Sequence, residues 1–230
     1  KHMFLRLFAS DIDGTLLSHS SPEREKSARA QFFRLFTLRP AQTMLCYVTG
    51  RSLALTKEVI TNAELPEPDA LICDVGTSLY LKQDGLWTAD NSYQKYLLQC
   101  WQGKTQAQAR VLLSEFSFLT LQEEEHQSEF KLSFYVDYNC DQNRLVEQVG
   151  ALLLNNAMES SIIFSRDPSK KRGLLDILPK GAAKLSALQH YMNRFSLIPE
   201  NVIYAGDSGN DLSVFCSGVR VIVVANTEKS

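Results

Sequence analysis

The sequence lacks a long apolar run, an excess of one charge and paired cysteines, and each absence excludes a class of protein. No stretch approaches the roughly 20 apolar residues that a membrane-spanning helix needs. The formal net charge is −2, and the basic run at residues 170–172 is short, so we expect no nucleic-acid surface. The five cysteines are odd in number and include no CxxC pair, which argues against a disulfide framework or a zinc site. We therefore expect a cytoplasmic protein with reduced thiols that binds neither nucleic acid nor membrane.

What the sequence does have is an alternation of apolar and amphipathic segments towards both ends of the chain. The apolar segments are too short for helices and are bounded by turn residues, which predicts strands. The resulting β-α-β order predicts an α/β protein with a parallel sheet and right-handed crossovers. Strands are predicted at residues 4–9, 44–48, 71–75, 174–178, 202–205 and 219–224, and helices at 22–38, 52–61, 181–195 and 211–216.

The middle of the chain has a different pattern. A strand predicted at residues 130–136 alternates apolar and polar side chains, as a strand does in an antiparallel sheet with one solvated face. A helix is predicted at residues 142–156, and Trp87 and Trp101 are expected in the core of this part. We interpret this middle part as an α+β cap inserted into the parallel core. The predicted division is a core of residues 3–82 and 167–230 and a cap of residues 83–166.

Two aspartates separated by one residue end the first apolar segment. Asp11 and Asp13 fall at the carboxyl end of the predicted strand, where open α/β sheets bind ligands, and Gly14 lets the chain turn away. One carboxylate can attack phosphorus while its neighbour handles the proton of the leaving group. The alternative is a polar turn, because Asp and Gly both favour turns.

Two further polar segments follow predicted strands in the same way. Thr49, Gly50 and Arg51 offer a hydroxyl and backbone amides at a helix start, which can bind a phosphoryl oxygen. Residues 207–211 supply two carboxylates and an amide, and such hard oxygen ligands suit Mg²⁺. Taken singly, the first segment is also consistent with a helix cap and the second with an Asx-rich turn. Their common position after strands favours one shared site.

These segments, together with a lysine near a helix start, resemble in order the four motifs of the haloacid dehalogenase-like (HAD-like) phosphatases. More narrowly, the chain resembles the sucrose-phosphatase branch of that family, which carries a large α+β cap. The resemblance implies a Rossmann-like core and an obligatory Mg²⁺. The matching runs are DIDGT, VTGRS, LPEPDALICDVGT, KLSFYVD, LDILPKGAAK and VIYAGDSGND.

The resemblance also implies a role for each matched residue. Asp11 is expected to be the nucleophile that forms an aspartyl-phosphate, Asp13 the acid and base, and Thr49 a ligand of the phosphoryl group. The catalytic lysine is expected at Lys184, with Lys180 as its rival because a Lys-Gly pair also occurs in relatives. The expected metal site comprises Asp11, the Asp13 main-chain carbonyl, Asp207 and Asp211, with Asn210 supporting it.

Sugar recognition is expected at the phosphate loop, residues 49–51, and in the cap. Lys131, Ser133 and Tyr135 share one face of the strand predicted at residues 130–136, which fits substrate contact and an ordinary solvent-facing strand equally well. The expected substrate-binding residues are Gly50, Arg51, Lys131, Arg172 and Asn210, and weaker candidates are Asp74, Gly76 and Thr77.

The sequence thus predicts a Mg²⁺-dependent phosphatase that acts on a small phosphate ester, with sucrose 6-phosphate as the preferred substrate. The alternatives are a phosphatase of another sugar phosphate or of a glycosylglycerate phosphate, and a phosphomutase that uses the same nucleophile. A non-enzymatic role is disfavoured because all four charged or hydroxyl-bearing motifs are present.

Overall fold

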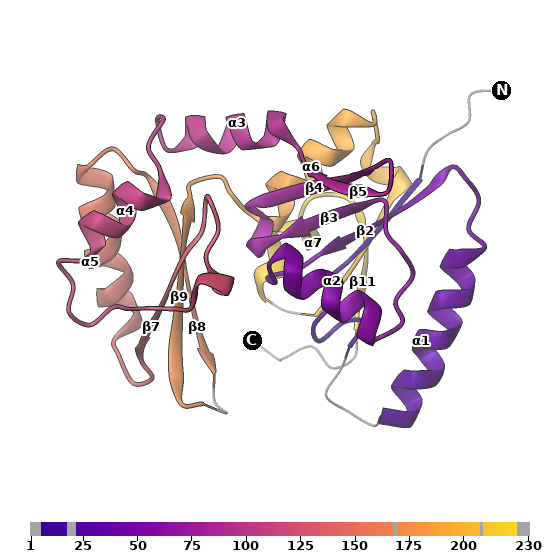
Figure 1. The fold of residues 1–230 in the computed structure, drawn as a ribbon, viewed down its shortest axis with the longest axis horizontal. Helices are drawn as coiled ribbons and strands as arrows, with labels where there is room; N and C mark the ends of the chain where they lie inside the picture. The colour runs from indigo at the N-terminus through magenta and orange to yellow at the C-terminus, as the bar shows by residue number, and fades with distance from the viewer. Residues whose placement is uncertain (1–5, 18–21, 168–169, 208, 225–230) are drawn as a thin grey trace. The chain divides into compact units, whose positions relative to one another are not determined.

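The structure is a computed structural model that describes residues 6–17, 22–167, 170–207 and 209–224. The chain forms two compact units, one inserted into the other (Figure 1). Unit 1 comprises Lys1–Asp90 and Ala183–Ser230, and unit 2 comprises Asn91–Ala182. The predicted α/β core with an inserted α+β part is confirmed. The two crossings between the units lie after residues 90 and 182, whereas the sequence predicted them after residues 82 and 166.

Unit 1 is built on a seven-stranded sheet in the order β11-β10-β1-β2-β3-β4-β5. The strands from β11 to β3 are parallel, and β4 and β5 add an antiparallel hairpin at the edge. The strands are β1 (Arg6–Ser10), β2 (Thr43–Val48), β3 (Ala70–Cys73), β4 (Ser78–Gln83), β5 (Leu86–Ala89), β10 (Val202–Gly206) and β11 (Arg220–Val223).

Helices pack on this sheet through apolar side chains. Phe32 and Phe36 of one helix pack against each other and against Phe8 of β1 with tilted rings, at centroid distances of 4.5 Å between the helix rings and 4.9 Å from Phe36 to Phe8. Burial of such aromatic area is a main source of stability. The α-helices are α1 (Pro22–Thr37), α2 (Leu53–Asn62), α6 (Lys184–Arg194) and α7 (Leu212–Phe215), and the 3₁₀ helices are η1 (Asp74–Gly76), η3 (Pro199–Asn201) and η4 (Gly209–Asp211).

The β4–β5 hairpin explains why the first crossing lies later than predicted. Its two-residue turn is Asp84-Gly85, with φ of 49° and 80°, and this Asp-Gly turn matches the twist of the two strands. Trp87 of β5 packs against the apolar cluster of unit 1 around Tyr47 and Leu71, so its predicted place in the cap core is wrong. The hairpin signal lay in the sequence, at Asp84-Gly85.

Unit 2 holds a four-stranded antiparallel sheet in the order β6-β7-β9-β8. Trp101 is fully buried here, as predicted, and its indole N–H donates to Ser160 Oγ over 3.0 Å. The strands are β6 (Thr120–Leu121), β7 (Leu132–Asp137), β8 (Ser160–Asp167) and β9 (Arg172–Pro179); the helices are α3 (Asn91–Cys100), α4 (Gln106–Leu113), η2 (Glu124–His126) and α5 (Gln142–Asn155).

Strand β9 corrects the prediction that residues 174–178 form part of the parallel sheet. It pairs antiparallel with β7 on one side and β8 on the other, so it is a central strand of unit 2. A central strand buries much of its surface whichever sheet it joins, and a short apolar run therefore does not reveal its partners.

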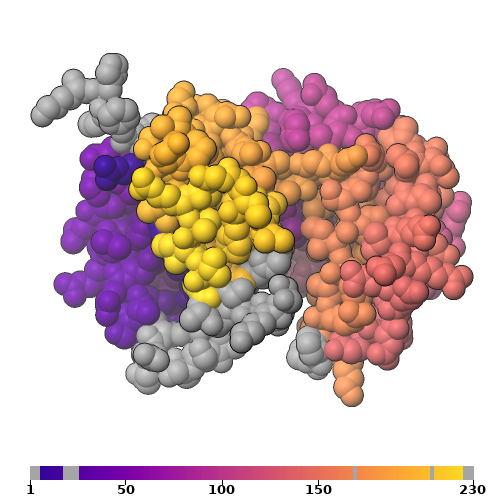
Figure 2. All heavy atoms as spheres, turned by 180° about the vertical axis from the view of Figure 1, so that it is seen from behind, coloured from indigo at the N-terminus to yellow at the C-terminus, as the bar shows by residue number. Residues whose placement is uncertain are grey.

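Two surface features complete the description. Within the described residues, none of the helices is both long and apolar enough to cross a membrane. Strand β11 is exposed along its length, with Ile222 48% and Val223 53% accessible, and the yellow C-terminal part of the chain lies on the visible surface of unit 1 (Figure 2).

Candidate active site

The predicted motifs of unit 1 gather at one edge of its sheet. Asp11 follows β1, Thr49 follows β2 and Asp207 follows β10, and these three strands are parallel neighbours. The carboxyl ends of parallel neighbours lie at the same edge, which is where α/β sheets bind ligands. The Asp11 N–H donates to the carbonyl of Ala205 over 2.9 Å, which fastens the first motif to the strand that carries the last one.

Lys184 connects the third motif to the first and the fourth. It is the first residue of α6 and is 2% exposed, and its Nζ donates to Asp11 Oδ1 at 2.9 Å, Asp211 Oδ1 at 2.8 Å and Asn210 Oδ1 at 3.1 Å. Lys180 belongs to unit 2, where its ammonium pairs with Glu159, and its side chain is 63% exposed. Of the two rival lysines, Lys184 therefore contacts the first aspartate.

Burial and charge shift the acidity of this pair. Burial raises the pKa of Asp11 to about 7, helped by the charges of Asp211 and Asp207 and opposed by Lys184. Burial also disfavours the charge of Lys184, but Asp11 and Asp211 outweigh that effect and hold its pKa above the ordinary value. Three carboxylates thus lie close together and the one ammonium pairs with two of them, which leaves an excess of negative charge in a largely buried site.

That excess fits a divalent cation. Asp11, Asp207 and Asp211 each offer a carboxylate oxygen, and these oxygens lie within 4.8 Å of one another. Carboxylate oxygens are the ligands that hard cations such as Mg²⁺ prefer, and a second positive charge would offset the repulsion. Gly14 makes room for this group: its φ is 80°, and a Cβ there would lie 2.1 Å from Asp207 Oδ2. The Asp13 carbonyl, the remaining predicted ligand, stays a prediction.

Asp211 is held by partners that the sequence did not single out. Tyr204 of β10 donates its hydroxyl to Asp211 Oδ1 over 2.6 Å, and the Asp207 N–H donates to Asp211 Oδ2 over 3.2 Å. Burial, together with the Asp211 carboxylate, raises the pKa of Tyr204 well above its usual value, so it remains a donor. A tyrosine inside an apolar strand next to a carboxylate-rich turn was the available signal.

Asp13 is not one of the three clustered carboxylates, and it is bound by Arg51. The guanidinium is bidentate: Nε donates to Asp13 Oδ2 at 2.8 Å and Nη2 to Oδ1 at 2.7 Å. The two side chains are 35% and 49% exposed. The sequence named Arg51 as a substrate-binding residue, and the structure places it on the predicted acid and base.

The phosphate loop is ordered by its own hydrogen bonds. The Thr49 side chain is buried and its Oγ1 accepts the Arg51 N–H at 3.2 Å, while Gly50 is exposed. Ser52 caps α2 by accepting the Leu55 N–H. The helix-cap interpretation is thus confirmed for Ser52, and binding of a phosphoryl group by Thr49 and Gly50 stays a prediction.

The predicted cap residues lie in unit 2. Ser133 is buried and donates its hydroxyl to Asp176 Oδ1, so its side chain links β7 to β9 within the sheet. Tyr135 donates to Glu123, and the Arg172 guanidinium lies 4.8 Å from its ring, at a cavity of about 450 Å³. Lys131 is 4% exposed. Contact of Lys131 or Arg172 with substrate stays a prediction.

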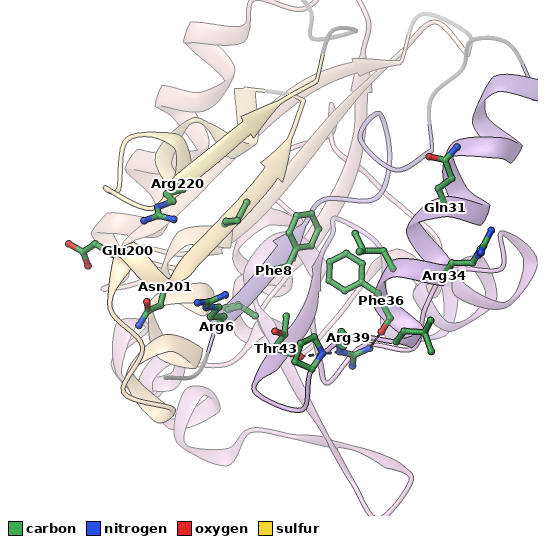
Figure 3. A pocket seen from close by; sticks show the side chains of 15 residues that line it. Arg6, Phe8, Gln31, Arg34, Phe36, Arg39, Thr43, Glu200, Asn201 and Arg220 are labelled. Atoms are coloured by element: carbon green, nitrogen blue, oxygen red, sulfur yellow. Dashed lines mark hydrogen bonds between the residues drawn. The ribbon is translucent and has the colours of Figure 1, made fainter. Parts of the chain in front are cut away.

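A larger cavity of about 890 Å³ lies at the amino ends of the parallel strands of unit 1, where β1, β2 and β11 begin (Figure 3). Figure 3 shows Gln31 and Arg34 of α1 on one side of it and Asn201 and Arg220 on the other. None of the predicted site residues lines it. Size alone therefore does not identify the chemically equipped site.

Comparisons with known proteins agree with this geometry. The sequence model of the family described as sucrose-6F-phosphate phosphohydrolase matches residues 4–230. A Nitrosococcus oceani protein whose name gives a HAD-like hydrolase and no substrate is 39% identical over 97% of this chain and 60% of its own length. A mannosylfructose-phosphate phosphatase of Agrobacterium fabrum is 29% identical over 96% of this chain and 84% of its own length. The Synechocystis sucrose-phosphatase structure with sucrose and phosphate has a TM-score of 0.79 at 24% identity, over 98% of this chain and 84% of that one.

Proposed function

Because the chain belongs to the sucrose-6F-phosphate phosphohydrolase family of HAD-like proteins, we propose that it hydrolyses the phosphate monoester of a sugar phosphate. One observation carries the proposal: a buried lysine ammonium lies between Asp11 and Asp211, at the edge where the predicted nucleophile meets the carboxylate group. Phosphate-monoester hydrolysis is among the slowest uncatalysed reactions, so charge repulsion between a carboxylate and a phosphate dianion must be offset. A buried cation beside the nucleophile provides such an offset.

In the proposed reaction Asp11 attacks phosphorus in line with the leaving oxygen. A bond forms between an Asp11 carboxylate oxygen and phosphorus while the bond from phosphorus to the sugar oxygen breaks, which gives an aspartyl-phosphate and a free sugar. Lys184 stabilises the charge on the phosphoryl oxygens, and Thr49 with the Gly50 amide orients them. Water then attacks the aspartyl-phosphate and releases inorganic phosphate.

Asp13 is proposed to transfer the protons. As an acid it protonates the departing sugar oxygen, and as a base it then takes a proton from the attacking water, so it returns to its starting state. Its carboxylate is held by Arg51 in this structure, within reach of solvent at 49% side-chain exposure. Substrate binding is expected to draw Arg51 towards the phosphoryl group, which frees one carboxylate oxygen of Asp13 to take up a proton from solvent before Asp13 acts as the acid.

Asp11 and Asp207 are proposed to hold Mg²⁺, with the Asp13 carbonyl as a further ligand and Asp211 beside them. When bound, the ion neutralises phosphoryl charge and orients the phosphate group. Asn210 accepts a hydrogen bond from Lys184, and we expect its side chain to contact a phosphoryl oxygen.

Sucrose 6-phosphate is the first substrate to test, because the family and the Synechocystis protein are named for sucrose phosphate hydrolysis. The Agrobacterium relative, whose name gives mannosylfructose phosphate, makes other disaccharide phosphates the second choice. Lys131 and Arg172 of unit 2 are the cationic side chains we expect near the sugar or its phosphate.

The test is phosphate release with Mg²⁺ from a panel of esters. The panel contains sucrose 6-phosphate, mannosylfructose phosphate, trehalose 6-phosphate, glycosylglycerate phosphates and simple hexose phosphates. Asp11→Asn keeps the shape of the side chain and removes the nucleophile, so it controls for contaminating phosphatase. Release by the wild type and not by this variant supports the proposal. Isomer formation without phosphate release would indicate a phosphomutase instead, and an inactive wild type would exclude both.

A further inference from the structure

The turn that follows β3 holds three consecutive residues in the left-handed region. Asp74, Val75 and Gly76 have φ of 54°, 61° and 94°. Left-handed backbone is uncommon for residues with a Cβ, and for a β-branched residue it is a true outlier. Such conformations persist only where the surrounding structure enforces them, and they concentrate at functional sites. The proposed reaction gives this turn no role so far.

One side of the turn holds the phosphate loop. The Asp74 N–H donates to the Arg51 carbonyl over 2.9 Å, and the Val75 N–H donates to the Thr49 carbonyl over 3.2 Å. Two adjacent amides therefore fix the backbone on both sides of Gly50. Through these bonds the turn sets the position of the Thr49 hydroxyl. It also sets the backbone position of Arg51, whose guanidinium binds Asp13.

The other side of the turn lies against the start of α6. A Cβ at Gly76 would lie 2.2 Å from the carbonyl carbon of Ala183 and 2.4 Å from the Lys184 nitrogen. These are backbone atoms, so no side-chain rotation could relieve the overlap. The absence of a side chain at Gly76 thus lets α6 begin where Lys184 reaches Asp11.

The turn is braced from within. Thr77 donates its hydroxyl to the Asp74 carbonyl over 2.9 Å, and Ser78 donates to Asp74 Oδ2 over 3.0 Å. Asp74 and Thr77 are each 2% exposed, so these bonds are shielded from water. The conformation is therefore set by the protein itself.

We propose that residues 74–76 are a positioning turn that fixes the phosphate loop and Lys184 relative to Asp11. This inference rests on the proposed function. It gives Asp74 and Gly76 a role through Thr49, Arg51 and Lys184 in place of the sugar contact considered from the sequence.

The first test compares Gly76→Ala with Gly85→Ala. Both replace a glycine at positive φ, but a Cβ at Gly85 has nothing within 4 Å. The Gly85 variant therefore reports the cost of backbone strain alone. Gly76→Ala is expected to lower kcat by about 100-fold relative to Gly85→Ala, as a displacement of catalytic groups by about 1 Å does. Stabilisation of Gly76→Ala by Mg²⁺ should persist, because Asp11 and Asp207 follow other strands, β1 and β10, whereas stabilisation by orthovanadate, a phosphoryl analogue, should be lost.

A second pair keeps the test decisive where Gly76→Ala does not fold. Thr77→Val preserves volume and removes the bond to Asp74, and Thr61→Val removes an exposed hydroxyl bond to Lys57 in α2. Thr77→Val is expected to lower kcat by about 10-fold, and Thr61→Val to leave it unchanged.

The outcomes separate this inference from the proposed function. A wild type that releases no phosphate refutes the proposed function, and the inference falls with it. If the wild type is active and the kcat of Gly76→Ala stays within about twofold of that of Gly85→Ala, the substitution leaves the activation barrier nearly unchanged. That result refutes only the positioning turn. Parallel loss of the Mg²⁺ and orthovanadate responses would show a merely structural role and refute it as well.

Discussion

Lys184 places a positive charge inside unit 1 at 2% exposure, and three oxygen atoms accept its hydrogen bonds. A buried charge is tolerated only when it is paired and hydrogen-bonded. Here the pairing is with Asp11 and Asp211, so the stability of the fold and the chemistry of the site depend on the same contact.

Lys184→Met should therefore affect both activity and stability. We expect kcat/KM to fall about 10²- to 10³-fold, because a charged donor in a desolvated site is lost. The free energy of unfolding should fall by about 3 kcal/mol, because two buried carboxylates lose their partner. Lys180→Met is the control: its ion pair with Glu159 is exposed, and such pairs contribute about 1 kcal/mol or less. Steady-state kinetics and urea unfolding measure both effects, and a larger kinetic loss in Lys180→Met would assign the catalytic lysine to Lys180.

Asp13→Asn should discriminate between leaving groups. A sugar alkoxide needs a proton as it departs, whereas p-nitrophenolate leaves without one, so loss of a general acid penalises the sugar ester more. We expect kcat/KM for the best sugar phosphate to fall about 10²- to 10⁴-fold, and that for p-nitrophenyl phosphate to fall much less. Equal losses with both esters would mean that Asp13 acts in another way, for example as the partner of Arg51.

Where a motif fixes a residue at the end of a strand or the start of a helix, the sequence also predicted the position of that residue in the fold. Asp11, Asp207 and Lys184 were each predicted at the end of a strand or the start of a helix, and the structure brings them together. The bond from Tyr204 to Asp211 and that from Arg51 to Asp13 were not predicted. Both depend on where side chains from separate elements meet, which strand and helix patterns do not specify.

At the scale of elements, helix α6 makes ion pairs within unit 1 at both of its ends. Its first residue is Lys184, and its last turns carry His190 and Arg194 to Asp90, the last residue before the crossing to unit 2. The Asp90 side chain is 1% exposed and lies 3.1 Å from Arg194 and 3.5 Å from His190. A buried carboxylate thus ties the end of β5 to the helix that begins at the site.

Asp90→Asn should destabilise unit 1 while leaving the chemistry intact. The amide keeps the shape and loses the charge, and a hydrogen bond to a charged group contributes about 1.5 to 3 kcal/mol. We therefore expect the free energy of unfolding to fall by about 2 kcal/mol. Asp84→Asn is the matched control, because Asp84 lies at the hairpin turn with φ of 49°, which asparagine tolerates. Urea denaturation measures the difference, and equal stability of the two variants would mean that the Asp90 pairs contribute nothing.

Sheet membership was the part of the element prediction that failed. Residues 174–178 were predicted as a strand and form one, but in the antiparallel sheet of unit 2. Strand existence follows from local composition, whereas strand partners follow from contacts distant in sequence. The first crossing to unit 2 lies after Asp90 and not after residue 82 for a different reason. The Asp84-Gly85 hairpin adds two antiparallel strands to the parallel sheet of unit 1.

At the scale of the whole molecule, the net charge of the chain differs from the local charge at the site. The chain carries a net charge of only −2, yet three carboxylates lie together at one edge of the sheet. Folding brings these carboxylates together, and their repulsion lowers the stability of the folded state. The same burial and like charges raise the pKa of Asp11 to about 7. A cation that binds only the folded chain would relieve this repulsion and stabilise the molecule as a whole.

Mg²⁺ should therefore raise the melting temperature of the wild type, and Asp207→Asn should abolish the effect. Binding to the native state alone adds about 2.7 kcal/mol at a concentration of 100 Kd. For a chain of this size that corresponds to a shift of about 5 to 10 °C. The shift should disappear on chelation with EDTA, and the exposed control Asp84→Asn should retain it. Differential scanning fluorimetry across a Mg²⁺ titration provides the measurement. A full shift in Asp207→Asn would place the cation elsewhere, because the proposed site loses one of its two carboxylate ligands in that variant.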